Sequence, residues 1–135
     1  CPTLRTTRHY QLVAPNHLDM TDYATFTPAG KPRTISIDAP VNNIEAYSSV
    51  QFKGQVAIAP FENTLAYRIY DLVGVELSAG SINVTAAAPG GPGTFDSRVS
   101  LGTILSGSVV RVEIQDISAA DGSLLAMDSV ELVVK

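Results

Sequence analysis

Residues 49–58 read SVQFKGQVAI, and along this stretch polar or small residues alternate with the apolar residues Val50, Phe52, Val56 and Ile58. Successive side chains of a β-strand point to opposite faces, so this alternation is typical of a strand that buries one face only. We therefore expect a strand whose apolar face packs on a core while its other face meets solvent.

The stretch NTLAYRIYDL (63–72) repeats the pattern. Leu65, Tyr67 and Ile69 alternate with other residues, and the turn-like sequence DLVG at 71–74 ends the run. Two half-buried strands in succession favour an antiparallel sheet. The apolar face of such a sheet must be covered by a second layer, which the rest of the chain has to supply.

From Thr34 onward the same two-residue rhythm recurs in short segments that are separated by turn signals. These segments are residues 35–37, 75–77, 82–86, 94–101, 109–116 and 124–134. About seven short strands without helical periodicity predict an all-β fold, an immunoglobulin-like two-sheet antiparallel sandwich over residues 34–135. A closed barrel stays open as an alternative, although the strands are few and interrupted.

Finer expectations follow from the last two segments. Arg111, Glu113 and Gln115 alternate with valine and isoleucine, so they are expected to face solvent. Met127 falls out of phase with the apolar residues that follow it, which predicts a β-bulge near residues 128–129.

Residues 1–33 differ from the rest because they are rich in threonine and proline. Proline lacks a backbone N–H and interrupts regular structure. We therefore expect an irregular N-terminal lead, a linker partly packed on the domain, in which residues 9–13 are compatible with one short strand.

Charge is distributed unevenly along the chain. Residues 1–33 carry four basic and two acidic residues, a net charge of +2, whereas the remaining 102 residues carry five basic and eleven acidic residues, a net charge of −6. An acidic domain repels polyphosphate, so we expect no nucleic-acid partner. No apolar run reaches the ~18 residues of a membrane-spanning helix.

Cys1 is the only cysteine, so no internal disulfide can form. A chain with cysteine as its first residue resembles a mature bacterial lipoprotein, in which this cysteine carries acyl chains. The resemblance implies an extracytoplasmic protein that is anchored to the bacterial cell membrane through lipid on Cys1. The alternative is a fragment that happens to begin there.

Side chains that could carry catalysis or hold a metal are few and scattered. His9, His17, Asp19 and Asp22 are the only concentration of metal-ligand types, and their spacing matches no known motif. Neither HExxH nor GxSxG occurs. Acidic residues at strand ends are typical turn formers. They are Glu62, Asp71, Asp96, Asp116 and Asp121. We expect no enzyme activity, no metal and no cofactor.

Arg68 and Tyr70 lie two residues apart, which places them on the same face of their strand. Tyrosine and arginine are frequent in protein interfaces, so we expect a contact surface for an envelope protein there. Phe61, just before this strand, is expected to close the end of the core. Alternatively, Tyr47, Tyr67 and Tyr70 stack on the sugar rings of a cell-wall glycan, although the chain has no tryptophan.

Several sequence blocks in residues 34–135 follow one another in a distinctive order. They are ISIDAP (35–40), FENTLAYRIYD (61–71), PGGPGTFDSRVSL (89–101) and VEIQDISAADGS (112–123). On these blocks the segment resembles the immunoglobulin-like domain of bacterial spore germination, the Gmad2 type. The resemblance implies a β-sandwich carried by exported or lipid-anchored proteins, and it brings no catalytic residues with it.

Taken together, these features predict a non-catalytic, lipid-anchored module of the cell envelope that binds or positions another envelope protein. The alternative prediction is a carbohydrate or cell-wall binding module.

Overall fold

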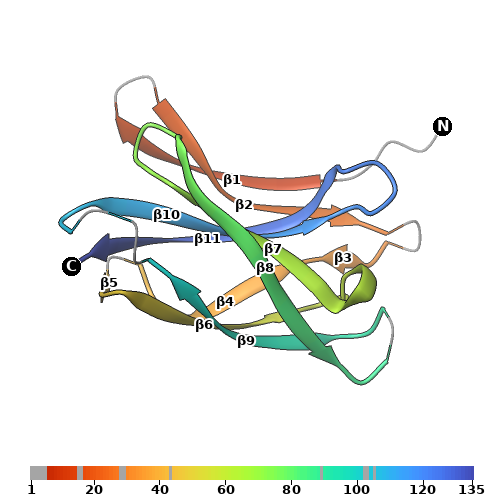
Figure 1. The fold of residues 1–135 in the computed structure, drawn as a ribbon. Coiled ribbons are helices and arrows are strands. Elements are labelled where there is room, and N and C mark those ends of the chain that lie inside the picture. Colours follow the sequence, from red (N-terminus) through yellow and green to blue (C-terminus); the bar gives the residue numbers. More distant parts are fainter. Residues whose placement is uncertain are drawn as a thin grey trace.

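The computed structural model describes residues 6–14, 17–27, 30–42, 44–88, 90–101, 104 and 106–135, with the backbone alone for residues 6, 11–14 and 17–21 (Figure 1). The described residues are all-β apart from one short 3-10 turn, η1. The elements are β1 Thr6–Ala14, β2 His17–Phe26, β3 Pro32–Arg33, β4 Ile35–Ala39, β5 Ile44–Ala46, β6 Ser49–Val56, η1 Phe61–Asn63, β7 Thr64–Tyr70, β8 Glu76–Ala86, β9 Gly93–Ser100, β10 Val109–Ile117 and β11 Leu124–Val134. The predicted all-β class is confirmed.

The described strands form one continuous, curled sheet in the order β1-β2-β11-β10-β7-β8-β9-β6-β4, which encloses the core as a half-barrel (Figure 1). Short β3 pairs with β2, and short β5 pairs with β11 in the only parallel arrangement of the described strands. A two-sheet sandwich of about seven strands is not confirmed, because eleven strands share this one sheet. Long β8 makes the sheet continuous, since residues 76–83 pair with β7 and residues 84–86 pair with β9.

The alternation along residues 49–58 becomes the one-sided burial of β6. Phe52 and Val56 are buried, whereas Gln51, Lys53 and Gln55 are exposed, so this prediction is confirmed. The buried residues join those of β7, β9, β10 and β11 in a single hydrophobic cluster. Burial of these apolar side chains is the main force that holds the curled sheet closed.

The N-terminal lead is more regular than its composition predicts. In the described part, β1 pairs with β2, and β2 pairs with β11 through residues 22–24. Tyr23 is buried, and the Thr25 hydroxyl donates a hydrogen bond of 2.8 Å to the Leu125 carbonyl. The irregular lead was therefore a wrong expectation for the residues of β1 and β2, because threonine favours strands.

The face of β10 that was predicted to meet solvent is largely buried. Glu113 and Gln115 are both buried there, Gln115 donates a hydrogen bond of 2.8 Å to Glu113, and Arg111 lies 2.6 Å from the other Glu113 oxygen. The curled sheet buries polar groups on this face, and their mutual contacts replace part of their hydration. Met127, opposite Gln115 on β11, is also buried.

The predicted bulge near residues 128–129 is also wrong. The register between β10 and β11 is regular there and shifts instead between Asp116 and Ile117, opposite residues 124–126. Met127 is out of phase with the core because it faces the second buried surface, not because the strand slips.

The Asp128 side chain links β11 to the edge strand β4 through a hydrogen bond. One carboxylate oxygen accepts a 2.9 Å hydrogen bond from the Ile37 N–H, and the other accepts one of 2.9 Å from the Ser129 N–H. Burial raises the pKa of Asp128, and these hydrogen bonds oppose the rise. The carboxylate thus takes the place of a neighbouring strand for one N–H of β4.

Candidate functional site

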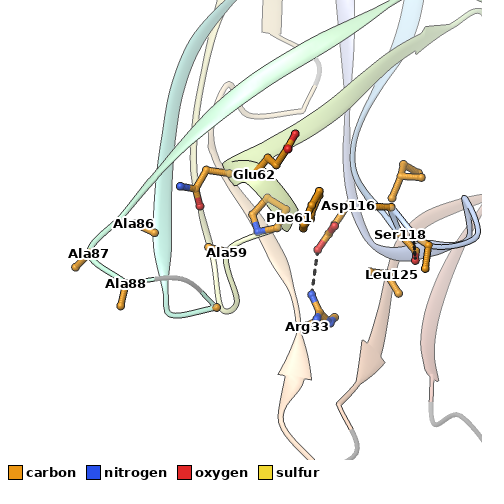
Figure 2. Close-up of a pocket in the computed structure, with 16 residues that line it drawn as sticks. Arg33, Ala59, Phe61, Glu62, Ala86, Ala87, Ala88, Asp116, Ser118 and Leu125 are labelled. Carbon is orange, nitrogen blue, oxygen red and sulfur yellow. Dashed lines mark hydrogen bonds and ion pairs between the residues drawn. The ribbon is translucent and has the colours of Figure 1, made fainter.

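An open pocket of about 790 Å³ lies at one end of the curled sheet (Figure 2). Five parts of the chain form it: β3, residues 59–63, the connection between β8 and β9, the end of β10 with the turn after it, and the start of β11. Its volume falls within the range of sites that bind small ligands. The pocket is therefore the main concave candidate in the described part of the chain.

A partly buried ion pair lies in this pocket. The Arg33 guanidinium of β3 is 3.5 Å from the Asp116 carboxylate of β10 (Figure 2), and their side chains are 29% and 5% exposed. Burial raises the pKa of Asp116, and the Arg33 charge opposes the rise. The pair offers a bound molecule both a hydrogen-bond donor and an acceptor.

Asp116 was expected to be an exposed turn former, and this expectation is wrong. It occupies the next inward position of β10 after Val112 and Ile114, and only 3% of the residue is exposed. The alternation along residues 109–116 was the signal that could have placed it, because a polar residue in an inward position marks a site or a buried pair.

The walls of the pocket are made of small residues, so the end of the core stays open. Six alanines line it: Ala59, Ala86, Ala87, Ala88, Ala119 and Ala120. Phe61 also lines it but remains 68% exposed, so the expectation that it closes the core is wrong. The described lining includes no histidine or cysteine.

The backbone is strained at the rim of this pocket. Glu62 and Asn63 have φ of 56° and 55°, the left-handed region that non-glycine residues seldom adopt. The Asn63 N–H donates a 2.9 Å hydrogen bond to the Pro60 carbonyl, which holds the turn. Strain of this kind gathers at functional sites, where the surrounding structure enforces it.

The predicted contact pair, Arg68 and Tyr70, lies beside the start of β8. Arg68 forms an ion pair of 2.8 Å with Glu76, in which both side chains are more than two-fifths exposed. The Arg111 guanidinium lies over the Tyr70 ring at 5.3 Å, and burial raises the pKa of Tyr70. The side chains of Arg68 and Tyr70 thus already have partners within the chain.

The turn between β7 and β8 is an apolar surface that sequence reasoning missed. We call residues 71–77 the hairpin tip. Its exposed aliphatic residues are Leu72, Val73, Val75 and Leu77, of which Val73 is 76% exposed. Turns normally carry polar residues, so four aliphatic residues within six positions were the available signal.

Asp71 fixes the shape of the hairpin tip. One of its carboxylate oxygens accepts hydrogen bonds from the N–H groups of Val73 and Val75, at 3.0 and 2.9 Å. The Gly74 N–H donates to the Asp71 carbonyl at 3.2 Å, and Gly74 takes a φ of +89° that suits glycine. Three backbone donors are therefore satisfied within the turn, and covering it with another molecule leaves none of them unpaired.

The remaining predicted ligands are only partly described. His9 and Asp22, opposite one another on β1 and β2, form a hydrogen bond between their side chains. The side chains of His17 and Asp19 lie outside the described residues, as does Cys1. Among the described side chains, no three of histidine, cysteine, aspartate and glutamate come together as metal ligands would.

No family model matches the chain, and no curated protein is significantly similar to it. None of the helical structure in the described residues is long and apolar enough to span a membrane.

Proposed function

We propose that the chain is a non-catalytic binding module of the bacterial cell envelope, which docks another protein through the hairpin tip. The observation that carries the proposal is the exposure of Leu72, Val73, Val75 and Leu77 on a turn whose backbone donors are already paired. Covering apolar surface contributes ~25 cal/mol per Å² to binding. A rigid turn loses little conformational entropy when it docks.

The charge around the tip supports a protein partner over a lipid surface. Asp71 and Glu76 flank the aliphatic residues, and residues 34–135 have a net charge of −6. Anionic lipid headgroups repel such a surface. An apolar pocket on a protein partner has no such charge and can bind the aliphatic residues of the tip.

The experiment compares capture of envelope proteins by the full chain and by two matched variants. Val73→Asp places a charge on the hairpin tip, whereas Val41→Asp places it on a similarly exposed valine, 65% exposed, between β4 and β5. We expect one protein to be captured by the original chain and by the Val41→Asp variant but not by the Val73→Asp variant. Equal capture by both variants would reject docking through the tip.

Anchoring to the membrane through lipid on Cys1 stays a prediction. Incorporation of labelled fatty acid into the precursor, lost in Cys1→Ala together with membrane partitioning, is the expected result. The immunoglobulin-like sandwich and the relation to the Gmad2 type are also part of the proposal. Packing of β6 and β9 against β7, β10 and β11 around one core supports the former.

A second candidate function, binding of a cell-wall glycan, is favoured by one specific observation. Phe61 is 68% exposed in a pocket that also holds Arg33 and Asp116, so a sugar ring can stack on the phenyl group while its hydroxyls reach the ion pair. Tyr67 and Tyr70 cannot form one platform, because residues three apart in a strand face opposite sides. Titration with soluble wall fragments should shift NMR signals near Phe61 in the original chain but not in Phe61→Ala.

A further inference from the structure

The first part of β8 is an open edge of the sheet. Residues 76–83 pair with β7 on one side, and pairing with β9 begins only at Val84, so no described strand occupies the other side. This open stretch is ~27 Å long at ~3.4 Å per residue. In an antiparallel ladder about every second residue directs its N–H and C=O away from the paired neighbour. The open side of β8 is thus a row of backbone groups that a further strand can pair with.

Residues 77–83, LSAGSIN, have none of the features that normally protect such an edge. They contain no charged residue and no proline, and Ala79, Gly80 and Ser81 are exposed. One of the two terminal strands of the sheet, β4, is treated differently, because Asp128 caps its Ile37 N–H. Natural proteins usually block open edges with lysine, proline or a covering segment. An unprotected edge beside an exposed apolar turn indicates that another chain covers both.

The Tyr67 ring of β7 covers the face of β8 that is shared with the core at Gly80. Ser78 and Gly80 are small, and the Tyr67 ring of β7 lies so close over Gly80 that an added Cβ would come within 2.5 Å of it. Tyr67 itself is only partly buried. A strand added next to Gly80 could extend the core by placing large apolar side chains beside this ring.

We propose that residues 76–83 of β8 bind an extended segment of the partner protein as an additional strand of the sheet. The partner segment has large apolar residues at alternate positions, on the face shared with Tyr67, and no acidic residues, because Glu76 and the net charge of −6 on residues 34–135 disfavour them. The inference rests on the proposed protein-binding function and specifies its partner. Pairing of main-chain groups provides affinity, and the alternate side chains provide specificity.

A second copy of the chain fits this edge less well than a peptide segment does. The hairpin tip and the open edge together span residues 71–83, about 13 residues, whereas a stable protein dimer uses ~20–30 residues on each side. Two copies would also bring together chains that each have a net charge of −4. A single strand added from a partner needs no larger surface.

The test selects peptides from a phage-displayed library of random dodecamers against the full chain and measures binding of the synthesised winners. Ala79→Lys combined with Ser81→Lys adds charge to the open edge, and Thr94→Lys adds it to an exposed residue of β9 as the control. We expect enriched peptides with alternating large apolar residues. Their affinity should fall about tenfold or more in the double variant and stay unchanged in the control. On binding, the amides of residues 76–83 should become protected from hydrogen exchange.

Three other results would each reject the addition of a strand to β8, for different reasons. If the peptides lose affinity in Val73→Asp but not in the double lysine variant, the hairpin tip binds protein and β8 adds no strand. If no peptide is enriched, or if protection appears elsewhere, the edge is not the site. If the original chain dimerises in sedimentation experiments and the double variant does not, the occupant is a second copy.

Discussion

Replacing Arg33 with methionine tests the ion pair in the pocket. The Asp116 side chain is only 5% exposed, so without Arg33 its negative charge loses its partner in a poorly hydrated site. Loss of one partner from a fully buried pair costs ~3–5 kcal/mol. Arg33 keeps 29% of its side chain exposed and lies 3.5 Å away, so we expect a smaller loss of unfolding free energy, about 1–2 kcal/mol at pH 7.

The loss of unfolding free energy in Arg33→Met should increase as pH rises. Burial places the folded-state pKa of Asp116 above its unfolded value, so the folded state binds more protons, and the contribution of this group to stability decreases as pH rises through the folded pKa. Arg33 limits that decrease, and its removal raises the pKa further. The difference between original and variant should therefore be smaller at pH 4 than at pH 7, because the raised pKa of Asp116 leaves more of this carboxyl protonated at the lower pH.

Urea unfolding followed by circular dichroism at pH 4 and pH 7 measures this difference. Asp116→Asn provides the background in which no carboxylate remains, and there Arg33→Met should cost less than about 0.5 kcal/mol. An equal loss at both pH values, or an undiminished loss in the Asp116→Asn background, would refute the electrostatic explanation and leave only lost packing.

Three further substitutions test the fold by thermal or urea unfolding. Gly54→Ala should cost about 2–3 kcal/mol of unfolding free energy, because its Cβ would lie 2.2 Å from the Ser36 carbonyl oxygen. As a control, Gly91→Ala should cost far less, because its Cβ would lie 3.3 Å from its nearest neighbour. Equal losses in both variants would contradict the explanation that the site of Gly54 is too crowded for a Cβ. Thr25→Val should cost about 1 kcal/mol through the lost hydrogen bond to β11, and no loss would show that the bond contributes nothing. Glu62→Gly should stabilise by about 0.5–1 kcal/mol, since glycine tolerates a φ of 56°, and a destabilised variant would mean that the turn is not strained.

The alternation of residues 49–58 was sufficient to predict β6 and its buried face. Phe52 and Val56 face the core and Gln51 faces solvent, which is the situation that a two-residue period describes. The same rule failed on β10, where Glu113 and Gln115 are buried on the opposite face. Alternation distinguishes the two faces of a strand, but only the curvature of the whole sheet decides whether the second face is also covered.

The local alternation of apolar and polar residues could not predict how the strands pair within the sheet. Whether strands belong to two sheets or one depends on β8, whose residues 76–83 and 84–86 pair with different neighbours. Residues 22–24 of β2 were expected in an irregular lead, yet they pair with β11, which follows about 100 residues later. Such long-range pairing leaves no periodic signal in either segment alone.

The candidate sites were predicted less well than the strands. Arg68 and Tyr70 lie near the hairpin tip, but each is engaged within the chain. The exposed Val73 was considered only as part of a turn, and the exposed Val75 only as the start of a strand. Asp116 was expected at a strand end without its partner. The approach of Arg33 to it depends on the docking of β3, which the sequence does not show.

The most direct test of the proposed docking is a photo-crosslink from the hairpin tip. The full chain, carrying p-benzoylphenylalanine in place of Val73, is irradiated in intact cell envelopes, and a second preparation carries it in place of the exposed Thr94 on β9. We predict one discrete cross-linked protein from position 73 and none from position 94. Cross-links of the same protein from position 94 alone, or none from position 73, would contradict a binding module that docks through this turn.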